Sequence, residues 1–424
     1  MLTVTTAVAD RSARTVVVIA TAYAVSTYGT FLNLLALGLF ALHITGSALS
    51  TGLFMAVRLA AGFLMGPLAG LLAGRYSRRY LMIGADLLSA GTLGLLVAAP
   101  AGARPALLWP VAVVLGAGQT LWGVALRSGL PDLVTADQLA RANSRLVTAR
   151  SVAMLLGFAS AGLLVARVGY SAAFLLDAAT YLLSALLLVT LRSRWGRAAA
   201  TGGHGAGPGR AGDRRALLRS VGPVVVGMIG VRAADALGSA SHNVGLPVYA
   251  NLVRPDDPAA FAATFTTAWA VGSLVAGRWV AWRTGRGARI TSERAFGIAT
   301  CAMSVFFVLA FTGLPLWLLV PVAVAAGAAD GYAEISYTTR LQAAPANRRA
   351  QLFGFASAAQ NAGFGLGMVG CAALLDRYAP LPVIAAAHGF ALAIALAFLL
   401  VSRLRNRPGH RDHQPTPQPV EVTS

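Results

Sequence analysis

The chain has 424 residues, of which 57% are hydrophobic and only 12% charged, whereas soluble domains carry about 25% charged residues. This composition argues against a soluble globular protein and favours a polytopic membrane protein. The net charge of +19 would suit a nucleic-acid-binding protein, but the basic residues lie between apolar runs and not along one basic face, so no nucleic-acid partner is expected.

Twelve apolar runs follow one another along the chain, and each is long enough to cross a hydrocarbon core of about 30 Å. Lipid offers no hydrogen-bond partner to an open backbone, so these runs predict transmembrane helices and an all-α membrane protein. The predicted spans cover residues 15–41, 47–72, 80–99, 106–127, 145–166, 171–191, 221–250, 260–282, 294–312, 315–339, 350–375 and 381–402.

The spans fall into two sets of six, an organisation typical of secondary transporters. The predicted segments are a lead of residues 1–14, an N-terminal half of 15–191, a flexible linker of 192–220, a C-terminal half of 221–404 and a disordered tail of 405–424. The linker is rich in Gly, Ala and Arg and the tail in Pro, Gln and His, and neither shows apolar periodicity.

All 34 basic residues are arginines, which together with the high Ala and Gly content indicates a GC-rich bacterial genome. If the N-terminus is placed in the cytoplasm, 28 of the arginines fall in the lead, alternate loops and the tail, and four fall on the opposite side. Positive loops remain inside, so the arginines predict a multi-pass protein of the bacterial inner membrane with a cytoplasmic lead, linker and tail.

The loop between the second and third spans reads GLLAGRYSRR and carries Gly70, Arg75, Arg78 and Arg79. It resembles the loop signature of the major facilitator superfamily, G-x-L-A-D-R-x-G-R-R/K, except that Gly74 stands where that family has an aspartate and Ser77 where it has a glycine. In the family the aspartate helps to latch the two halves together on the cytoplasmic side. We expect Asp86, roughly two turns into the third span, to pair with Arg75 or Arg79.

A second stretch, LRSGLPDLVTADQLARANSRLVTARSVAMLLGFASAGLLV, resembles the fourth loop and fifth span of a bacterial branch of the same superfamily. That branch includes enterobactin-exporter-like and macrolide-exporter-like proteins, and FLLDAATYLLSALLL in the sixth span supports the resemblance. The resemblance implies the twelve-helix major facilitator fold and export. The antiporter signature of the fifth span is incomplete, because Phe158 replaces its proline, and the arginine that many members have in the fourth span is missing.

Charged residues inside a span are costly and therefore suggest function. Asp330 and Glu334 lie four residues apart in the tenth span, where two carboxylates repel each other and can share a proton, so they are the first candidates for proton coupling. Asp235 in the seventh span is the next candidate, although Arg232, three residues away, can form an ion pair with it. The alternative is that Arg58 or Arg232 neutralises the Asp330 and Glu334 pair structurally.

The resemblance implies that the first, fourth, seventh and tenth spans line a central cavity. Polar and aromatic residues at helical spacing on these spans, together with the intramembrane arginine of the second span, are the candidate cavity residues. They are Tyr23, Thr27, Thr30, Asn33, Arg58, Gln119, Trp122, His242 and Tyr337. A mixed aromatic and polar lining suits a small amphipathic substrate.

The chain has no phosphate-binding loop and no metal-ligand or catalytic motif. We therefore expect a monomeric transporter among membrane lipids, neither an enzyme nor cofactor-dependent, which uses a proton gradient to export a small amphipathic drug or secondary metabolite. One alternative is an importer or uniporter of a small solute, favoured by the incomplete signature of the fifth span. A more remote alternative is a non-transporting membrane sensor or enzyme.

Overall fold

Long apolar helices make up nearly the whole of the computed structural model, which describes residues 2–45, 48–191 and 213–405. These residues form twelve α-helices that are long and apolar enough to cross a membrane, two short 3-10 helices and no strand. The predicted all-α class and the twelve spans are therefore confirmed.

The first half contains six of these helices and the two 3-10 helices. They are α1 (Leu2–Thr45), α2 (Ala48–Arg75), α3 (Arg78–Ala98), η1 (Ala101–Ala103), α4 (Arg104–Gly129), η2 (Leu130–Asp132), α5 (Leu139–Val168) and α6 (Tyr170–Thr190). The second half contains the other six. They are α7 (Asp213–Val253), α8 (Pro258–Gly285), α9 (Glu293–Ala310), α10 (Leu316–Gln342), α11 (Ala346–Leu375) and α12 (Pro380–Arg405).

Two helices extend into segments that were predicted to lie outside the halves. Helix α1 begins at Leu2, so the lead continues the first span as helix. Helix α7 begins at Asp213, inside the predicted linker, and kinks at Gly222, whose φ of 80° is one that glycine adopts without strain. The rest of the linker (192–212) and the tail from residue 406 onward lie outside the described residues.

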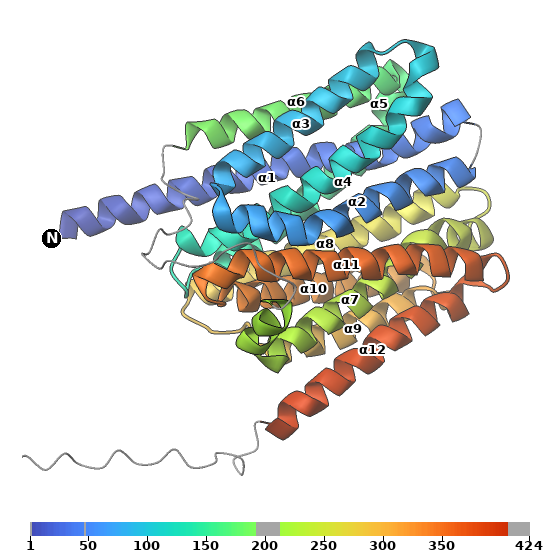
Figure 1. Ribbon diagram of the computed structural model, residues 1–424. Helices are drawn as coiled ribbons and strands as arrows, with labels where there is room; N and C mark the ends of the chain where they lie inside the picture. Colours follow the sequence, from blue (N-terminus) through green and yellow to red (C-terminus); the bar gives the residue numbers. More distant parts are fainter. Residues whose placement is uncertain (1, 46–47, 192–212, 406–424) are drawn as a thin grey trace, which may run out of the picture.

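The helices run roughly along one common direction, with α1–α6 grouped on one side and α7–α12 on the other (Figure 1). The start of α1 and the end of α12 lie at the same end of the bundle, which we call the terminal end (Figure 1). The connections from α2 to α3, α4 to α5 and α10 to α11 lie at this end too, because successive helices alternate in direction.

The two halves contact each other where α2 packs along α11 and α5 packs along α8. Glycines allow the backbones to approach closely: a Cβ atom placed on Gly66 would lie 2.6 Å from the carbonyl oxygen of Gly354, and one placed on Gly354 would overlap the carbonyl oxygen of Gly66. Gly66 is in the second part of α2 and Gly354 in the first part of α11, so this contact is toward the terminal end.

We expect Gly354→Ala to destabilise the protein, because the new methyl group would meet backbone atoms of α2 that cannot move aside cheaply. Gly365 on the same helix is the matched control, since a Cβ atom there has nothing within 4 Å. Gly365→Ala should raise stability by up to about 1 kcal/mol through helix propensity. Thermal unfolding midpoints of the two purified variants check the opposite signs; equal midpoints would contradict the close contact.

Candidate functional site

A group of buried carboxylates surrounds one guanidinium between α7 and α10. Nη1 of Arg232 lies 2.7 Å from Oδ2 of Asp235 and 3.7 Å from Oδ1 of Asp330, and its Nη2 lies 2.6 Å from Oε2 of Glu334. Asp235 is one turn from Arg232 on α7, and the other two acids are one turn apart on α10. We call these four residues the acid cluster. The ion pair within α7 is as predicted, and Arg232, not Arg58, approaches the pair on α10.

One guanidinium cannot balance three carboxylates, and a second one comes from the other half. Nη2 of Arg127 on α4 lies 2.7 Å from Oε1 of Glu334. Each oxygen of Glu334 is therefore held by an arginine of a different half. The side chain of Glu334 is 8% exposed, so little solvent screens either ion pair. The acid cluster is thus physically connected to the contact between the halves.

A second group of contacts joins the halves nearer the terminal end. Asp132 in η2 forms ion pairs with Arg78 of α3 and, at 3.0 Å, with Nη1 of Arg349 of α11. Nη1 of Arg349 also donates to the carbonyl oxygen of Ser128. We call Arg78, Asp132 and Arg349 the latch. Its carboxylate comes from η2 and connects the two halves. Gly74 stands where the family signature has an aspartate, and a Cβ atom placed on Gly74 would have only the Cβ of Ala350 nearby, at 4.0 Å.

The amides of Asn143 and Gln342 add to these contacts. Nδ2 of Asn143 on α5 donates to Oγ1 of Thr339 at 2.9 Å and to Oε1 of Gln342 at 2.6 Å, both on α10. Nε2 of Gln342 donates to the carbonyl oxygen of Arg127 at 3.0 Å. Together with the latch, these bonds connect the two halves toward the terminal end.

The remaining residues of the predicted loop signature have separate roles. Arg79 donates to the carbonyl oxygens of Leu188 and Val189 at the end of α6, and Arg75 is exposed. Gly70 lies against α11, where a Cβ atom would be 2.9 Å from the carbonyl oxygen of Ala350. Of the three arginines, only Arg78 contributes to the latch.

The predicted pairing of Asp86 with Arg75 or Arg79 is wrong. Its carboxylate accepts hydrogen bonds from Oγ of Ser184 at 2.6 Å and from Nε1 of Trp122 at 3.2 Å, and Oγ of Ser26 lies at 3.5 Å. The reason is direction: the side chain points into the first half, where α1, α4 and α6 converge, and not toward the loop. Trp122 is 6% exposed and is therefore part of this buried network rather than of an open cavity wall.

Two of the predicted cavity residues on α1 also lie inside the first half. Asn33 is fully buried and donates to Asp177 of α6. Thr30 is 9% exposed and shares a hydrogen bond with the hydroxyl of Tyr181. These side chains bind α1 to α6 and do not face an open cavity in this structure.

The other candidates of the first half are more accessible, with the exception of Arg58. Tyr23, which stacks on the ring of Trp122, and Thr27 are half-buried, and Gln119 is exposed. Arg58 is 6% exposed, and its Nη2 lies 3.4 Å from Oε1 of Gln119. Its Nη1 has no partner, and in the described part of the chain Arg58 forms no ion pair, so it does not neutralise Asp330 and Glu334.

His242 and Tyr337 are likewise inside the second half. The ring of His242 stacks on Phe307 with centroids 3.9 Å apart, and its Nδ1 lies 3.1 Å from Nε2 of His388. Tyr337 is 2% exposed and packs against Phe296. His242 therefore faces α9 and α12, and Tyr337 faces α9, so neither side chain lines an open cavity in this structure.

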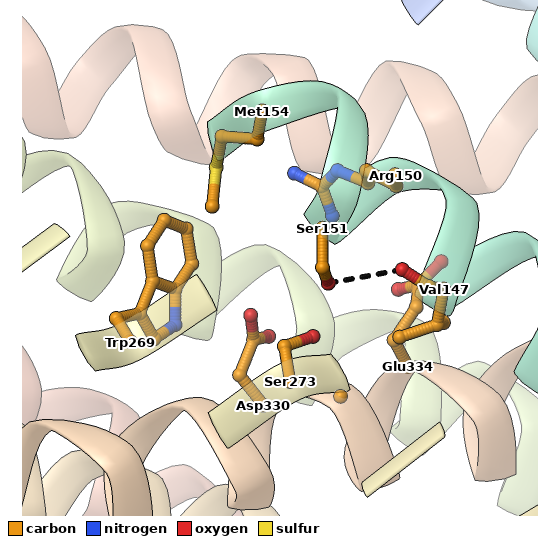
Figure 2. Close-up of a pocket in the computed structure, with 9 residues that line it drawn as sticks. Val147, Arg150, Ser151, Met154, Trp269, Ser273, Asp330 and Glu334 are labelled. Atoms are coloured by element: carbon orange, nitrogen blue, oxygen red, sulfur yellow. Dashed lines mark hydrogen bonds between the residues drawn. The ribbon is translucent and has the colours of Figure 1, made fainter. Parts of the chain in front are cut away.

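A small pocket borders the acid cluster. Its walls come from both halves: Arg150, Ser151 and Met154 on α5, Trp269 and Ser273 on α8, and Asp330 and Glu334 on α10 line it, among others. Figure 2 shows the guanidinium of Arg150 and the carboxylate of Asp330 directed into this space from opposite sides.

Sequence reasoning missed Arg127, Arg150 and Arg349 as site residues, because it counted them among the loop arginines that orient the chain. Only the position of Arg150 could have indicated its role, because it lies eleven residues inside α5, too deep for a loop residue. Among the described residues, no group of three or more His, Cys, Asp or Glu side chains is arranged to hold a metal ion.

Comparison with known proteins agrees with this architecture. The family model described as Major Facilitator Superfamily matches residues 19–368. No curated protein sequence matches the chain significantly.

Several solved structures share the fold, and three of them are similar over nearly the whole chain. One is FucP, a major facilitator superfamily transporter in the outward conformation, with 16% identity, a TM-score of 0.74, and coverage of 94% of this chain and 100% of that one. The others are both described as a bacterial homologue of the iron transporter ferroportin in the outward-facing state, at 15% identity and a TM-score of 0.72, and with soaked iron at 16% and 0.70. Each of these covers 92% of this chain and 99% of its own. Since the family model covers most of the sequence, the chain belongs to the major facilitator superfamily.

Proposed function

We propose that this multi-pass membrane transporter uses the proton gradient to export a small amphipathic molecule by alternating access. The observation that carries the proposal is the position of the acid cluster. It lies in the contact between the halves, beside a pocket that both halves line, and one of its carboxylates is held by an arginine from each half.

The arginine distribution supports a cytoplasmic location for the terminal end in a bacterial inner membrane. With that orientation, the latch and the α2–α11 contact form a closed cytoplasmic gate, and the structure corresponds to an outward-facing state. The similar FucP and ferroportin-homologue structures are described as outward-facing, which is consistent with this interpretation.

Asp330 is the best candidate for the coupling proton. Arg232 holds Asp235 and Glu334 at 2.7 and 2.6 Å but approaches Asp330 only to 3.7 Å, and Asp330 borders the pocket. When Asp330 is protonated, Arg232 pairs with Asp235 and Glu334 only. The negative charge of the acid cluster, which Arg127 of the other half contacts through Glu334, is then smaller. Protonation then shifts the population between the outward-facing and inward-facing states.

We expect Asp330→Asn to abolish gradient-driven efflux, because the neutral amide cannot exchange a proton. Cells expressing the variant are compared with wild type for retention of a panel of lipophilic dyes and antibiotics, with and without a protonophore. Asp376→Asn is the matched control, since Asp376 is an exposed acid at the other end of the bundle. Efflux by Asp330→Asn at the wild-type rate would disprove the assignment of the proton site.

An importer or uniporter of a small solute is the second candidate. It is favoured by Phe158, which packs on Phe31 of α1 with ring centroids 5.2 Å apart at the place where the antiporter signature has a proline. The same panel separates the candidates: an exporter lowers the amount of compound in expressing cells, and an importer or uniporter raises it.

A further inference from the structure

The pocket beside the acid cluster combines opposite charges on facing walls. Arg150 projects from α5 of the first half, and Asp330 projects from α10 of the second half (Figure 2). Trp269 of α8 closes one side of the same space, with its indole ring turned toward Asp330 (Figure 2). A ligand in this pocket therefore contacts both halves and meets a cation and an anion at once.

Arg150 has a free guanidinium. Within the part of the chain that the structure describes it makes no hydrogen bond or ion pair, although it interacts electrostatically with Asp330 and Glu334. The other arginines around the pocket, Arg127 and Arg232, are each bound to a carboxylate at less than 3 Å. A guanidinium at this depth is costly unless it is paired, and its planar fork fits a carboxylate.

The indole of Trp269 provides a second free donor. Its Nε1 is buried and has no hydrogen-bond partner. Buried donors without a partner are uncommon and each calls for an explanation. A ligand acceptor in the pocket would satisfy this donor and the guanidinium of Arg150 together.

The opposite wall offers the complementary group. Asp330 has the longest contact with Arg232 in the acid cluster, 3.7 Å, so its carboxylate is available to a donor from the pocket. The side chain of Met154 and the ring of Trp269 supply apolar surface between the charged groups. The pocket walls therefore fit a ligand that has an acceptor group, a donor group and an apolar body between them.

From these walls we infer that the transported molecule is a small zwitterion of the amino-acid or short-peptide type. Its carboxylate binds Arg150 and Nε1 of Trp269, its ammonium binds Asp330, and its apolar side chain lies against Met154 and the ring of Trp269. This inference rests on the proposed transport function and names its substrate class. It also explains antiport, because the ammonium and the proton compete for the carboxylate of Asp330.

Binding of matched ligands to the full chain in lipid nanodiscs tests the inference without any gradient. The ligands are leucine, phenylalanine and leucyl-leucine, each with its carboxyl-amidated and its N-acetylated derivative, and the readout is the ligand-dependent rise in unfolding temperature. We expect at least one zwitterion to bind, and each of its blocked derivatives to bind at least about tenfold more weakly. No stabilisation by any zwitterion, or equal stabilisation by blocked derivatives, would overturn the inference using wild-type protein alone.

Two variants test where the carboxylate and the ammonium of the ligand bind. Arg150→Gln should remove the preference for a free carboxylate and keep the preference for a free ammonium, and Asp330→Asn should do the reverse. Arg145→Gln, an exposed arginine on the same helix, should change neither preference. If the preferences survive both substitutions, the ligand lies elsewhere and the inference fails.

The two proposals can fail separately. If zwitterions bind as described but efflux by Asp330→Asn remains coupled to the gradient, the proton site is wrong and the substrate class stands. If Asp330→Asn loses coupled efflux but no zwitterion binds, the substrate class is wrong and the proton site stands.

Discussion

Replacing Arg232 with glutamine should strongly destabilise the folded transporter. The substitution leaves Asp235, Asp330 and Glu334 without their shared guanidinium, and among them only Glu334 keeps another arginine within ion-pair distance. Removal of one partner from a buried ion pair costs about 3–5 kcal/mol, because the other charge is left uncompensated in a low-dielectric interior. We expect a much lower thermal unfolding midpoint and a smaller fraction of monodisperse protein after extraction.

The control for this prediction is Arg254→Gln, which removes an exposed arginine at the other end of the bundle and should leave the midpoint unchanged. Combining Arg232→Gln with Asp235→Asn should recover part of the loss, since one fewer carboxylate is left unpaired. Acidic buffer should also recover part of it by protonating the acids. A midpoint for Arg232→Gln equal to that of Arg254→Gln would show that Arg232 does not hold the acid cluster together.

The fold could be predicted from the sequence because the apolar runs leave few alternatives. Each run has the length of a spanning helix, and a backbone in lipid must satisfy its own hydrogen bonds. The ends of the helices were harder to predict. Helix α7 begins at Asp213, within a segment whose Gly and Arg content indicated a flexible linker. Local composition does not show whether a helix continues beyond the membrane.

Contacts within one helix were also predictable, and contacts between helices were not. The spacing of Arg232 and Asp235 predicted an ion pair on α7, and that pair is present. The period of polar residues on α1 marked Thr30 and Asn33 but could not tell a cavity from the interior of the half, where α6 covers them. Such a choice depends on which neighbour covers the helix face.

The latch shows how a departure from a family pattern is compensated in three dimensions. Gly74 removes the carboxylate that the family signature places in the α2–α3 loop, so the sequence left the connection between the halves in doubt. In the structure, Asp132 supplies a carboxylate from η2 and pairs with arginines of both halves. The missing charge is thus replaced from a segment more than fifty residues away.

Asp132→Asn should therefore open the terminal end. The substitution leaves Arg78 and Arg349 facing each other, with side chains only 5% and 10% exposed and no carboxylate between them. Because the side chain of Asp132 is itself 35% exposed, we expect a cost to the closed state of about 1–3 kcal/mol, less than for a fully buried pair. A cost of that size lowers the ratio of closed to open molecules by about 5- to 150-fold.

The measurement is a distance distribution between spin labels on the two halves at the terminal end. Labels are attached to cysteines at the exposed positions Ala136 and Asn347, in a background where Cys301 and Cys371 are replaced by alanine. Wild type should give one short distance, and Asp132→Asn should shift most of the population to a longer one. Arg349→Gln should shift it too, and adding Asp132→Asn to Arg349→Gln should have a smaller effect than Asp132→Asn alone, because the pair is already broken. If Asp132→Asn keeps the short distance, the latch does not hold the halves together, and the amides of Asn143 and Gln342 with the α2–α11 backbone contact are sufficient to close the gate.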